Sequence, residues 1–390
     1  MKGLVSLLLL SFSAQVVARV WMSREGVEME ADLVKVEGDT VVLKIRATGK
    51  ELEAPITEFA TKDQEYCKKI RDDQKKEEEK GNWDAPWPKN VSTPDDLEII
   101  DVAGNPDSGK FVYLSPHYEF VCDVRLTKSV VRSFAKLFEA THRSMEELPF
   151  NFQRALQGGG DKRHKILLFE TKGSYIKNGG PPSSAGVYIG GRDGGKVMVP
   201  LTSLGVKPLG SGYTRDRKRS NKTLAHELVH QLTDYPYYSH GARGWFTEGL
   251  AEYVAVSQAS GDRFSFQNNL DEIRDYATAY GKDGRGGRAL GKEISLPDLR
   301  GYMLQSYVSF TSNANFNYGM GMLITAYFIH MDDEGSRKNL VAFLKAAKKG
   351  RSGEALLDVL RAGRTWEELA ADISKSWRRK GVKIEIGENS

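Results

Sequence analysis

The chain has 390 residues, of which 40% are hydrophobic and 28% charged, and this composition is ordinary for a soluble globular protein. Its formal net charge is only +4. So small an excess, without an RNA-binding motif or a basic recognition helix, excludes nucleic acid as the expected partner. The length predicts two or three domains.

The first 18 residues, MKGLVSLLLLSFSAQVVA, have the order of a secretory signal peptide: a lysine, an apolar run, then small residues. We expect cleavage after Ala18, which makes the protein secreted or periplasmic. The alternative is an uncleaved anchor, although the run is short for a membrane span. No later segment approaches transmembrane length, so no membrane span is expected in the mature chain.

Residues 19–70 show short runs of alternating apolar residues separated by glycine turns. The runs comprise Val27, Met29, Ala31 and Leu33, followed by Val41, Leu43 and Ile45. Such alternation predicts antiparallel strands, here forming a small SH3-like β-barrel that ends in a turn and a short helix.

This segment resembles the SLA1 homology domain 1 (SHD1) family. The matching features are Arg19-Val20-Trp21, the Gly26 turn, the strands from Ala31 to Val34 and Val41 to Lys44, and the ending from Pro55-Ile56 to Tyr66. The resemblance implies an accessory module that binds a protein partner or acts as a spacer, without catalysis.

Residues 71–96 are first highly charged and then rich in Pro, Asn and Trp, which predicts a linker between two domains, helical at first and then extended. Trp83 and Trp87 within it are candidates for docking onto a neighbouring domain. The two cysteines, Cys67 and Cys122, fall on opposite sides of the linker, so we expect two unpaired thiols.

Residues 97–385 are predicted to form one α+β domain. Strands are expected in LEIIDV, KFVYLSPHYEFVCDV and HKILLF, and a helix in TKSVVRSFAKLFEATHRSMEEL. AGVYIGGRDGGKVMVPL predicts a hairpin, and KPLGSGYTRDRKRSN after it predicts a solvated loop, with a mobile lid as the alternative. Further helices are expected towards the C-terminus.

The stretch TLAHELVHQL predicts a helix because leucine recurs every four residues. Residues four apart share one face of a helix, so His226 and His230 project side by side. Two imidazoles at this spacing can bind one tetrahedral zinc ion, and Glu227 can then take a proton from the zinc-bound water. This is the HExxH arrangement. Two surface histidines on an amphipathic helix are the alternative.

A third metal ligand is expected in WFTEGLAEYVA, where Glu248 lies 18 residues after His230. This segment also predicts a helix, with Glu248 and Glu252 four apart on one face. We assign Glu248 as the third zinc ligand and Glu252 as the carboxylate that accepts the other ring N–H of His226. A solvated face of a surface helix is the alternative.

The remaining catalytic group would be a hydrogen-bond donor to the oxyanion of the tetrahedral intermediate. Tyr318, in the Gly-rich run FNYGMGM, is the candidate, and a core aromatic is the alternative. His240 is a second candidate. The other histidines are expected to be structural or exposed: His117, His142, His164 and His330.

HELVH followed by TEGLAEY resembles the gluzincin peptidases, the thermolysin and aminopeptidase type. Thr247 stands where many members have Asn, and no GAMEN-like motif is present, so aminopeptidase specificity is not implied. SPHYEFVCDV, SAGVYIGGRDGGKVMVPL and NYGMGMLITAYFIHM give a closer resemblance to the peptidase-MA-like family of exported bacterial proteins, the DUF1570 type.

The resemblance implies a thermolysin-like zincin domain, with a mixed sheet, the HExxH helix and a mainly helical C-terminal part. It implies Zn2+ held by His226, His230 and Glu248, a tyrosine in a later helix, and an edge strand of the hairpin that lines the substrate cleft. It says little about which substrate is cleaved.

Together these features predict an exported zinc-dependent metallohydrolase, a peptidase acting on a peptide or protein substrate. The alternative is a catalytically silent, zinc-containing binding or scaffold protein of the cell envelope. A structural α/β protein without a metal is the third possibility.

Overall fold

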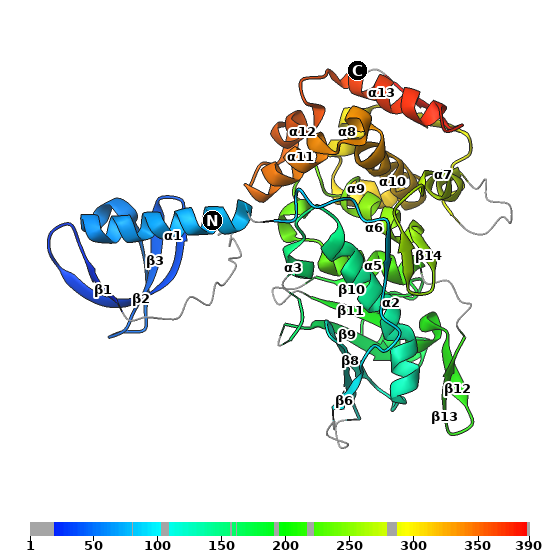
Figure 1. Cartoon of the computed structure of the whole chain (residues 1–390), viewed down its shortest axis with the longest axis horizontal. Coiled ribbons are helices and arrows are strands. Elements are labelled where there is room, and N and C mark those ends of the chain that lie inside the picture. The colour runs from blue at the N-terminus through cyan, green and yellow to red at the C-terminus, as the bar shows by residue number, and fades with distance from the viewer. Residues whose placement is uncertain are drawn as a thin grey trace. The chain divides into compact units, whose positions relative to one another are not determined.

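The computed structural model describes residues 19–79, 81–102, 109–156, 158–160, 162–190, 195–216, 222–278 and 287–387. The chain divides into two compact units, Met1–Gly81 and Asn82–Ser390, and Figure 1 labels many of their elements. The predicted signal segment, residues 1–18, lies outside the described residues.

The smaller unit is a four-stranded antiparallel sheet with one long helix packed on it. Trp21 lies at the centre of its core, where its ring meets the rings of Phe59 and Tyr66 edge-on at 5.6 and 5.8 Å. Its elements are β1 (Arg19–Met22), β2 (Glu28–Glu37), β3 (Thr40–Ile45), β4 (Glu51–Pro55), the 3-10 turn η1 (Ile56–Glu58) and α1 (Thr61–Glu79).

The predicted strands are present, but in the part of the chain that the structure describes they form an open sheet with β1 and β4 as its edges, and no closed barrel is seen. The helix α1 covers the apolar face, so the sheet buries its core without closing on itself. The helix also ends at Glu79, well beyond the short helix that was expected.

The larger unit contains a six-stranded mixed sheet in the order β10-β11-β9-β8-β7-β6. The two pairings that involve β9 are parallel and the others are antiparallel. Thus the predicted hairpin forms β10 and β11, and β10 is an edge strand. The strands are β6 (Ile100–Val102), β7 (Phe111–Leu114), β8 (Tyr118–Cys122), β9 (His164–Phe169), β10 (Val187–Ile189) and β11 (Lys196–Pro200).

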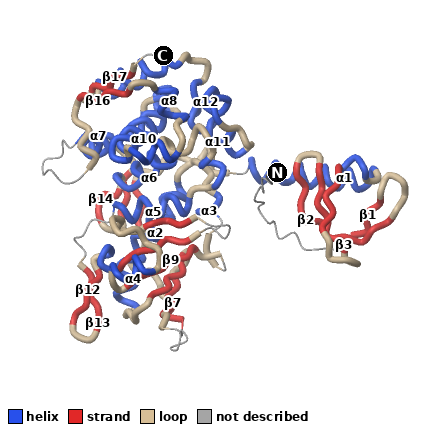
Figure 2. The backbone as a smooth tube through the Cα atoms, turned by 180° about the vertical axis from the view of Figure 1, so that it is seen from behind, coloured by secondary structure: helices blue, strands red, loops and turns tan. Residues whose placement is uncertain are grey.

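Both faces of this sheet are covered. Successive side chains of a strand point to opposite faces, so neighbouring residues of β9 belong to different clusters. Ile166 and Leu168 of β9 belong to the main core, together with residues of α2 (Lys128–Glu147) and α5 (Lys222–Leu232). Phe169 belongs to a small separate cluster beneath α4 (Lys172–Lys177). Figure 2 shows the strands and the helices of this unit in separate colours.

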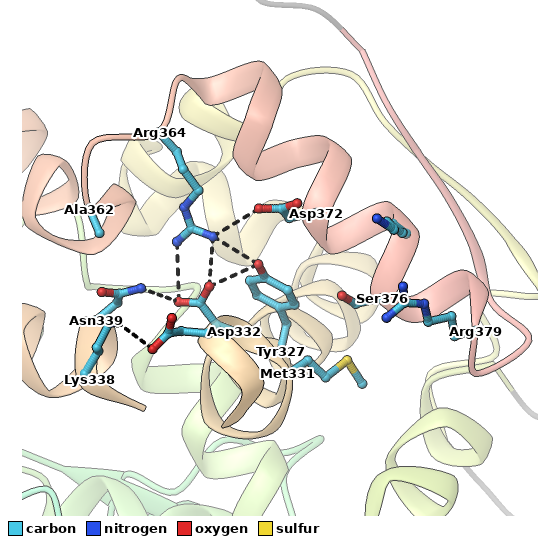
Figure 3. A pocket seen from close by; sticks show the side chains of 12 residues that line it. Tyr327, Met331, Asp332, Lys338, Asn339, Ala362, Arg364, Asp372, Ser376 and Arg379 are labelled. Atoms are coloured by element: carbon cyan, nitrogen blue, oxygen red, sulfur yellow. Dashed lines mark hydrogen bonds and ion pairs between the residues drawn. The ribbon is translucent and has the colours of Figure 1, made fainter. Parts of the chain in front are cut away.

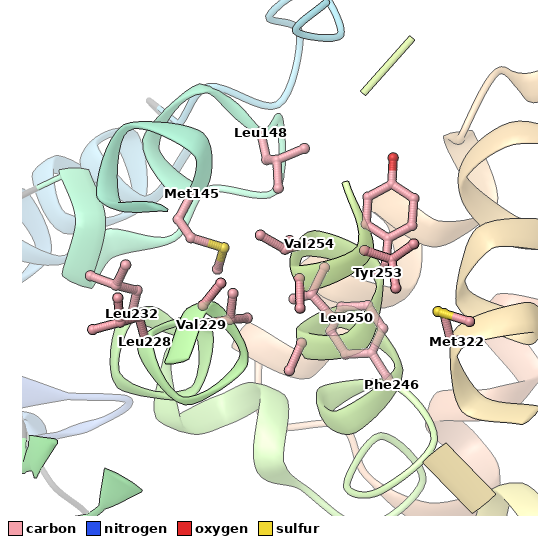
Figure 4. Packing of buried hydrophobic residues seen from close by; sticks show 14 of the residues in the cluster. Met145, Leu148, Leu228, Val229, Leu232, Phe246, Leu250, Tyr253, Val254 and Met322 are labelled. Atoms are coloured by element: carbon pink, nitrogen blue, oxygen red, sulfur yellow. The ribbon is translucent and has the colours of Figure 1, made fainter. Parts of the chain in front are cut away.

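The helix α6 (Thr247–Val256) lies between α5 and α10 (Ala314–His330), and all its residues are buried. A Cβ atom on Gly249 would lie 2.3 Å from the carbonyl oxygen of Gly321, so α6 and α10 touch through their backbones. On its other side α6 packs against α5 and α2 through Met145, Leu228 and Leu250 (Figure 4).

The larger unit has further elements beside the sheet and these helices. They are β5 (Asn90–Ser92), α3 (Gln153–Leu156), η3 (Leu201–Leu204), β12 (Val206–Leu209), β13 (Gly212–Arg215), η4 (Tyr235–Tyr238), β14 (Gln258–Ser260), β15 (Arg263–Ser265), α7 (Leu270–Thr278), β16 (Glu293–Leu296), α8 (Leu299–Leu304), α9 (Tyr307–Ser312), η5 (Asp332–Gly335), α11 (Lys338–Lys348), α12 (Gly353–Arg361), α13 (Trp366–Arg378) and β17 (Lys383–Ile386).

Two expectations about connecting segments differ from the structure. The predicted solvated loop begins with the hairpin β12–β13, and its last residues, 217–221, lie outside the described part of the chain. The predicted linker, residues 71–96, contains the end of α1 and a strap, residues 82–96, that belongs to the larger unit.

The strap is held by backbone pairing and by aromatic packing. Its strand β5 pairs with β15, and the Trp87 ring packs against Phe150, Tyr253 and Phe266 while its Nε1 donates to the Phe266 carbonyl at 3.2 Å. Trp83 is also buried. Burial of two indole rings explains why this Pro-rich stretch is ordered.

Cys67 and Cys122 are unpaired and buried in different units, as expected. Burial raises the pKa of the two thiols to about 11 and about 12. Among the described helices, none is both long enough and apolar enough to cross a membrane. The segregated helices and strands of the larger unit are consistent with the predicted α+β class.

Candidate metal centre

The leucine side chains of α5 pack into the core, and its two histidine side chains point towards α6. His226 and His230 are four residues apart and therefore one turn apart on the same face. Their Nε2 atoms lie 3.0 Å from each other, and each lies 3.1 Å from Oε2 of Glu248, which α6 supplies. All three residues are buried, with exposures of 7%, 8% and 2%.

Three converging atoms of this kind could hold a metal ion. Imidazole nitrogen and carboxylate oxygen bind zinc at about 2.0–2.2 Å, and tetrahedral geometry then separates ligand atoms by roughly 3.3 Å. The observed separations are close to this value. Among the described residues, no other set of three His, Cys, Asp or Glu side chains converges in the same way.

The histidines and carboxylates of the group shift one another's pKa values. Burial by itself lowers the pKa of His226, but the hydrogen bonds and charges of Glu248 and Glu252 outweigh it and raise this pKa to about 10. Burial opposes ionisation of Glu248, yet the two histidines hold its pKa well below the usual value. The carboxylate is therefore ionised at neutral pH, as a metal ligand must be.

Glu252 lies one turn after Glu248, with Oε1 2.9 Å from Nδ1 of His226. Arg288 approaches the same carboxylate with two bonds, from Nε at 3.0 Å and from Nη2 at 2.7 Å. Burial alone would raise the pKa of Glu252, but His226 and Arg288 lower it to about 2. An anionic Glu252 fixes the orientation of the His226 ring, so that Nε2 faces Glu248.

Glu227 points away from the core towards the edge of the sheet. Its Oε2 accepts a hydrogen bond of 2.8 Å from the backbone N–H of Tyr188, in the edge strand β10. The residue next to His226 thus joins α5 to β10.

Tyr318 lies on α10, where its ring stacks on His226 with centroids 5.8 Å apart and an interplanar angle of 10°. Burial and the charge of Glu248 raise the pKa of Tyr318 above its usual value, so the hydroxyl remains a donor. His240 is not brought to the group, because its Nε2 contacts the carbonyl of Leu304 at 2.9 Å.

Three contacts to the group come from residues that the sequence did not single out. The Tyr307 hydroxyl donates to Oε1 of Glu248 at 2.7 Å, and the Tyr238 hydroxyl donates to the carbonyl of His230 at 3.0 Å. Arg288 is the third. They lie on α9, η4 and the chain before β16, and no periodic pattern marks them.

Three of the four histidines expected to be structural or exposed form a second cluster, in which His142 is buried and His117 and His164 are half-buried. His117 Nδ1 lies 2.6 Å from Oε2 of Glu139, and the His117 ring stacks on His142 at 3.9 Å. His164 lies beside His142, and both Nε2 atoms would lie 2.8 Å from a Cβ atom on Gly158. This close approach leaves the histidines packed against a glycine, which fits a structural role.

A polar cavity of about 430 Å³ shares no residue with the metal-binding group. Figure 3 shows Asp332 at its centre, bonded to Arg364 at 2.8 Å and to Tyr327 at 3.2 Å. Arg364 also reaches Asp372 of α13. These bonds join α10, η5 and α13, and we assign the network to the stability of the helical part.

Comparison of the chain with known protein families, with curated proteins and with solved structures gave no match. The geometry of the group formed by His226, His230 and Glu248 therefore carries the functional conclusion.

Proposed function

We propose that this protein is an exported zinc-dependent metallohydrolase that cleaves peptide bonds. The observation that carries the proposal is the convergence of His226, His230 and Glu248, with Glu227 adjacent in sequence and directed towards an edge strand. A buried His-His-Glu set that leaves room for a water ligand is the arrangement used by catalytic zinc sites.

The roles of the residues follow from their positions. His226, His230 and Glu248 hold the ion, and Glu252 with Arg288 orients the His226 ring. Bound zinc supplies a Lewis acid that polarises the scissile carbonyl and lowers the pKa of a bound water.

Two further groups act on the substrate and on the water. Glu227 takes the proton of the attacking water and later delivers it to the leaving amine. Tyr318 donates a hydrogen bond to the oxyanion, for which its raised pKa keeps the proton in place.

The edge strand β10 is the proposed substrate platform. An extended peptide can add to an exposed strand edge through main-chain hydrogen bonds. Tyr188 of β10 already gives its N–H to Glu227, so a peptide along this edge would meet the proposed general base. The sequence resemblances support a gluzincin-type architecture for this unit and an SHD1-like, partner-binding role for the smaller one.

The first test measures zinc by elemental analysis in the purified mature chain. We expect about one zinc per chain, loss of most of it in Glu248→Ala, and retention in Glu227→Gln and in the surface control Glu272→Gln. A folded wild-type protein that takes up no zinc when zinc is supplied would refute the proposal.

The second test measures hydrolysis of a peptide library. Glu227→Gln should lose at least about 100-fold in kcat, because general acid-base catalysis contributes about 10²–10⁴-fold. Full activity of this variant would exclude the mechanism. Zinc binding without any activity that depends on Glu227 would favour the scaffold alternative.

A further inference from the structure

Arg154 lies close to the proposed centre and is bonded only to neutral groups among the described residues. Its Nη1 donates to the hydroxyl of Tyr188 at 3.0 Å and to the carbonyl of Gln231 at 3.3 Å. The side chain is partly buried. Removing a guanidinium from water has a free-energy cost, which a carboxylate partner normally offsets.

Three carboxylates of this region have other partners, and Glu227 among them accepts the backbone N–H of Tyr188. Asp234 accepts the backbone N–H groups of Gln153 and Arg154 at 2.9 and 3.0 Å, and its Oδ2 lies 2.9 Å from Nζ of Lys348. At the proposed centre, Glu252 is bonded to Arg288. In the described part of the chain, Arg154 is thus left without the ion pair that Arg288 has.

Tyr188 links Arg154 to the proposed reaction. The backbone N–H of this residue binds Glu227 at 2.8 Å, and its hydroxyl accepts from Arg154. Arg154 is therefore one tyrosine side chain away from the contact with the general base.

The geometry of the guanidinium fits a carboxylate. Its five N–H donors form a planar fork that can bind both oxygens at once. Both hydrogen bonds described for the Arg154 side chain come from Nη1, so Nε and Nη2 are available for a ligand in the described structure.

We propose that Arg154 binds a carboxylate of the substrate close to the scissile bond. This inference rests on the proposed peptidase function and names its substrate class: peptides with Asp or Glu near the scissile bond, or with their C-terminal carboxylate there. A side-chain carboxylate and a C-terminal carboxylate would bind the guanidinium in the same way, and the experiment distinguishes them.

The experiment compares quenched fluorescent peptides in pairs, with Glu or Gln at each position and with a free or amidated C-terminus. For the wild type we expect about 10- to 100-fold higher kcat/KM for the carboxylate at one position, which is the range for a charge-assisted pair. A preference in the Glu/Gln pairs assigns a side chain, and one in the acid/amide pair assigns the C-terminus.

In Arg154→Gln the ratio of kcat/KM between the carboxylate peptide and its neutral partner should fall to near one, mainly through a higher KM for the carboxylate peptide. Arg274→Gln on α7 should keep the wild-type ratio. If Arg154→Gln does not fold, Arg154→Lys, which keeps the charge but loses the fork, should show a reduced preference. Thermal unfolding of each variant checks that the fold is retained.

Cleavage without a preference for a carboxylate, or a preference that Arg154→Gln and Arg154→Lys leave unchanged, would overturn this inference and leave the proposed function standing. Absence of any cleavage that depends on Glu227 in the zinc-loaded wild type would instead overturn the proposed function, and this inference with it.

Discussion

Glu248 is held on both of its oxygens. Oε2 lies 3.1 Å from each histidine Nε2, and Oε1 accepts the Tyr307 hydroxyl at 2.7 Å. Burial, then the charge of Glu248, raises the pKa of Tyr307 above its usual value, so this hydroxyl remains a donor. Tyr307 is therefore a positioning residue for the proposed third ligand.

Removal of this hydroxyl in Tyr307→Phe should weaken zinc binding by about 10- to 100-fold, because groups that orient metal ligands contribute this much to affinity. Competition with a chromogenic chelator measures the affinity, and Tyr235→Phe, which removes a hydroxyl from an exposed ring, is the matched control. Equal affinities for all three proteins would show that Tyr307 does not position Glu248.

The histidine cluster of the larger unit predicts a loss of stability in acid. Burial lowers the pKa of His142 to about 2 and that of His164 to about 4, from about 6.5 in an unfolded chain. Below pH 6.5 the unfolded chain binds protons that the folded chain does not. The stabilisation is thus complete above about pH 6.5 and falls as the pH drops towards 4.

Denaturant unfolding between pH 7 and pH 4.5 measures this effect. In His142→Leu the free energy of unfolding should decrease less steeply with falling pH, by up to about 1.4 kcal/mol per pH unit, the value for one proton. His240→Leu is the control, because His240 is exposed. Identical slopes in wild type and His142→Leu would contradict the prediction.

At the scale of elements, the close approach of α6 and α10 sets the position of Glu248. Thr247 and Glu248 begin α6, and Gly249 follows directly at the contact with α10. A helix that carries a ligand in its first turn can hold it in place only if its axis is fixed. The backbone contact at Gly249 and Gly321 fixes this axis.

Gly249→Ala tests this contact. The new Cβ atom would lie 2.3 Å from the Gly321 carbonyl and 2.5 Å from Oγ1 of Thr325, so the helices must separate. We expect a destabilisation of about 1–3 kcal/mol or more, and weaker zinc binding. Gly173→Ala in α4, whose nearest contact would be 3.7 Å, should be neutral or stabilising by up to about 1 kcal/mol. Similar stability changes in the two variants would show that the contact between Gly249 and Gly321 does not fix α6.

At the scale of the whole molecule, the boundary between the two units lies before Asn82, and the strap is part of the larger core. Asn82 donates to the carbonyls of Glu146 and Leu148 at 2.7 and 2.8 Å, and its Oδ1 accepts the N–H of Asn151. Trp87 fills a site between Phe150 and Phe266.

Two fragments that begin on either side of the strap test this boundary. Residues 82–390 should unfold at nearly the temperature of the larger unit in the full chain. Residues 97–390, which begin where the sequence placed the domain, should be less stable by several kcal/mol, since loss of one large buried aromatic costs about 3–5 kcal/mol. Thermal unfolding followed by circular dichroism compares them, and equal midpoints would show that the strap is dispensable.

Prediction from sequence succeeded where one element carries the signal. The 3.6-residue period placed His226 and His230 on one helix face, and the same rule placed Glu248 and Glu252 on another. It failed for the bounds of the linker, because a polar, Pro-rich composition does not reveal where a domain begins, although the expected docking of Trp83 and Trp87 is seen.

The sequence by itself determined the two helices of the centre and their ligand faces, which depend on local periodicity, and the unpaired thiols, which depend on where the linker divides the chain. The tertiary structure alone decided that Glu248 meets the histidines at 3.1 Å, that Tyr307 holds its other oxygen, and that Glu227 faces Tyr188. These contacts join segments tens of residues apart, and their positions are fixed by the packing of helices and sheet, which leaves no period in the sequence.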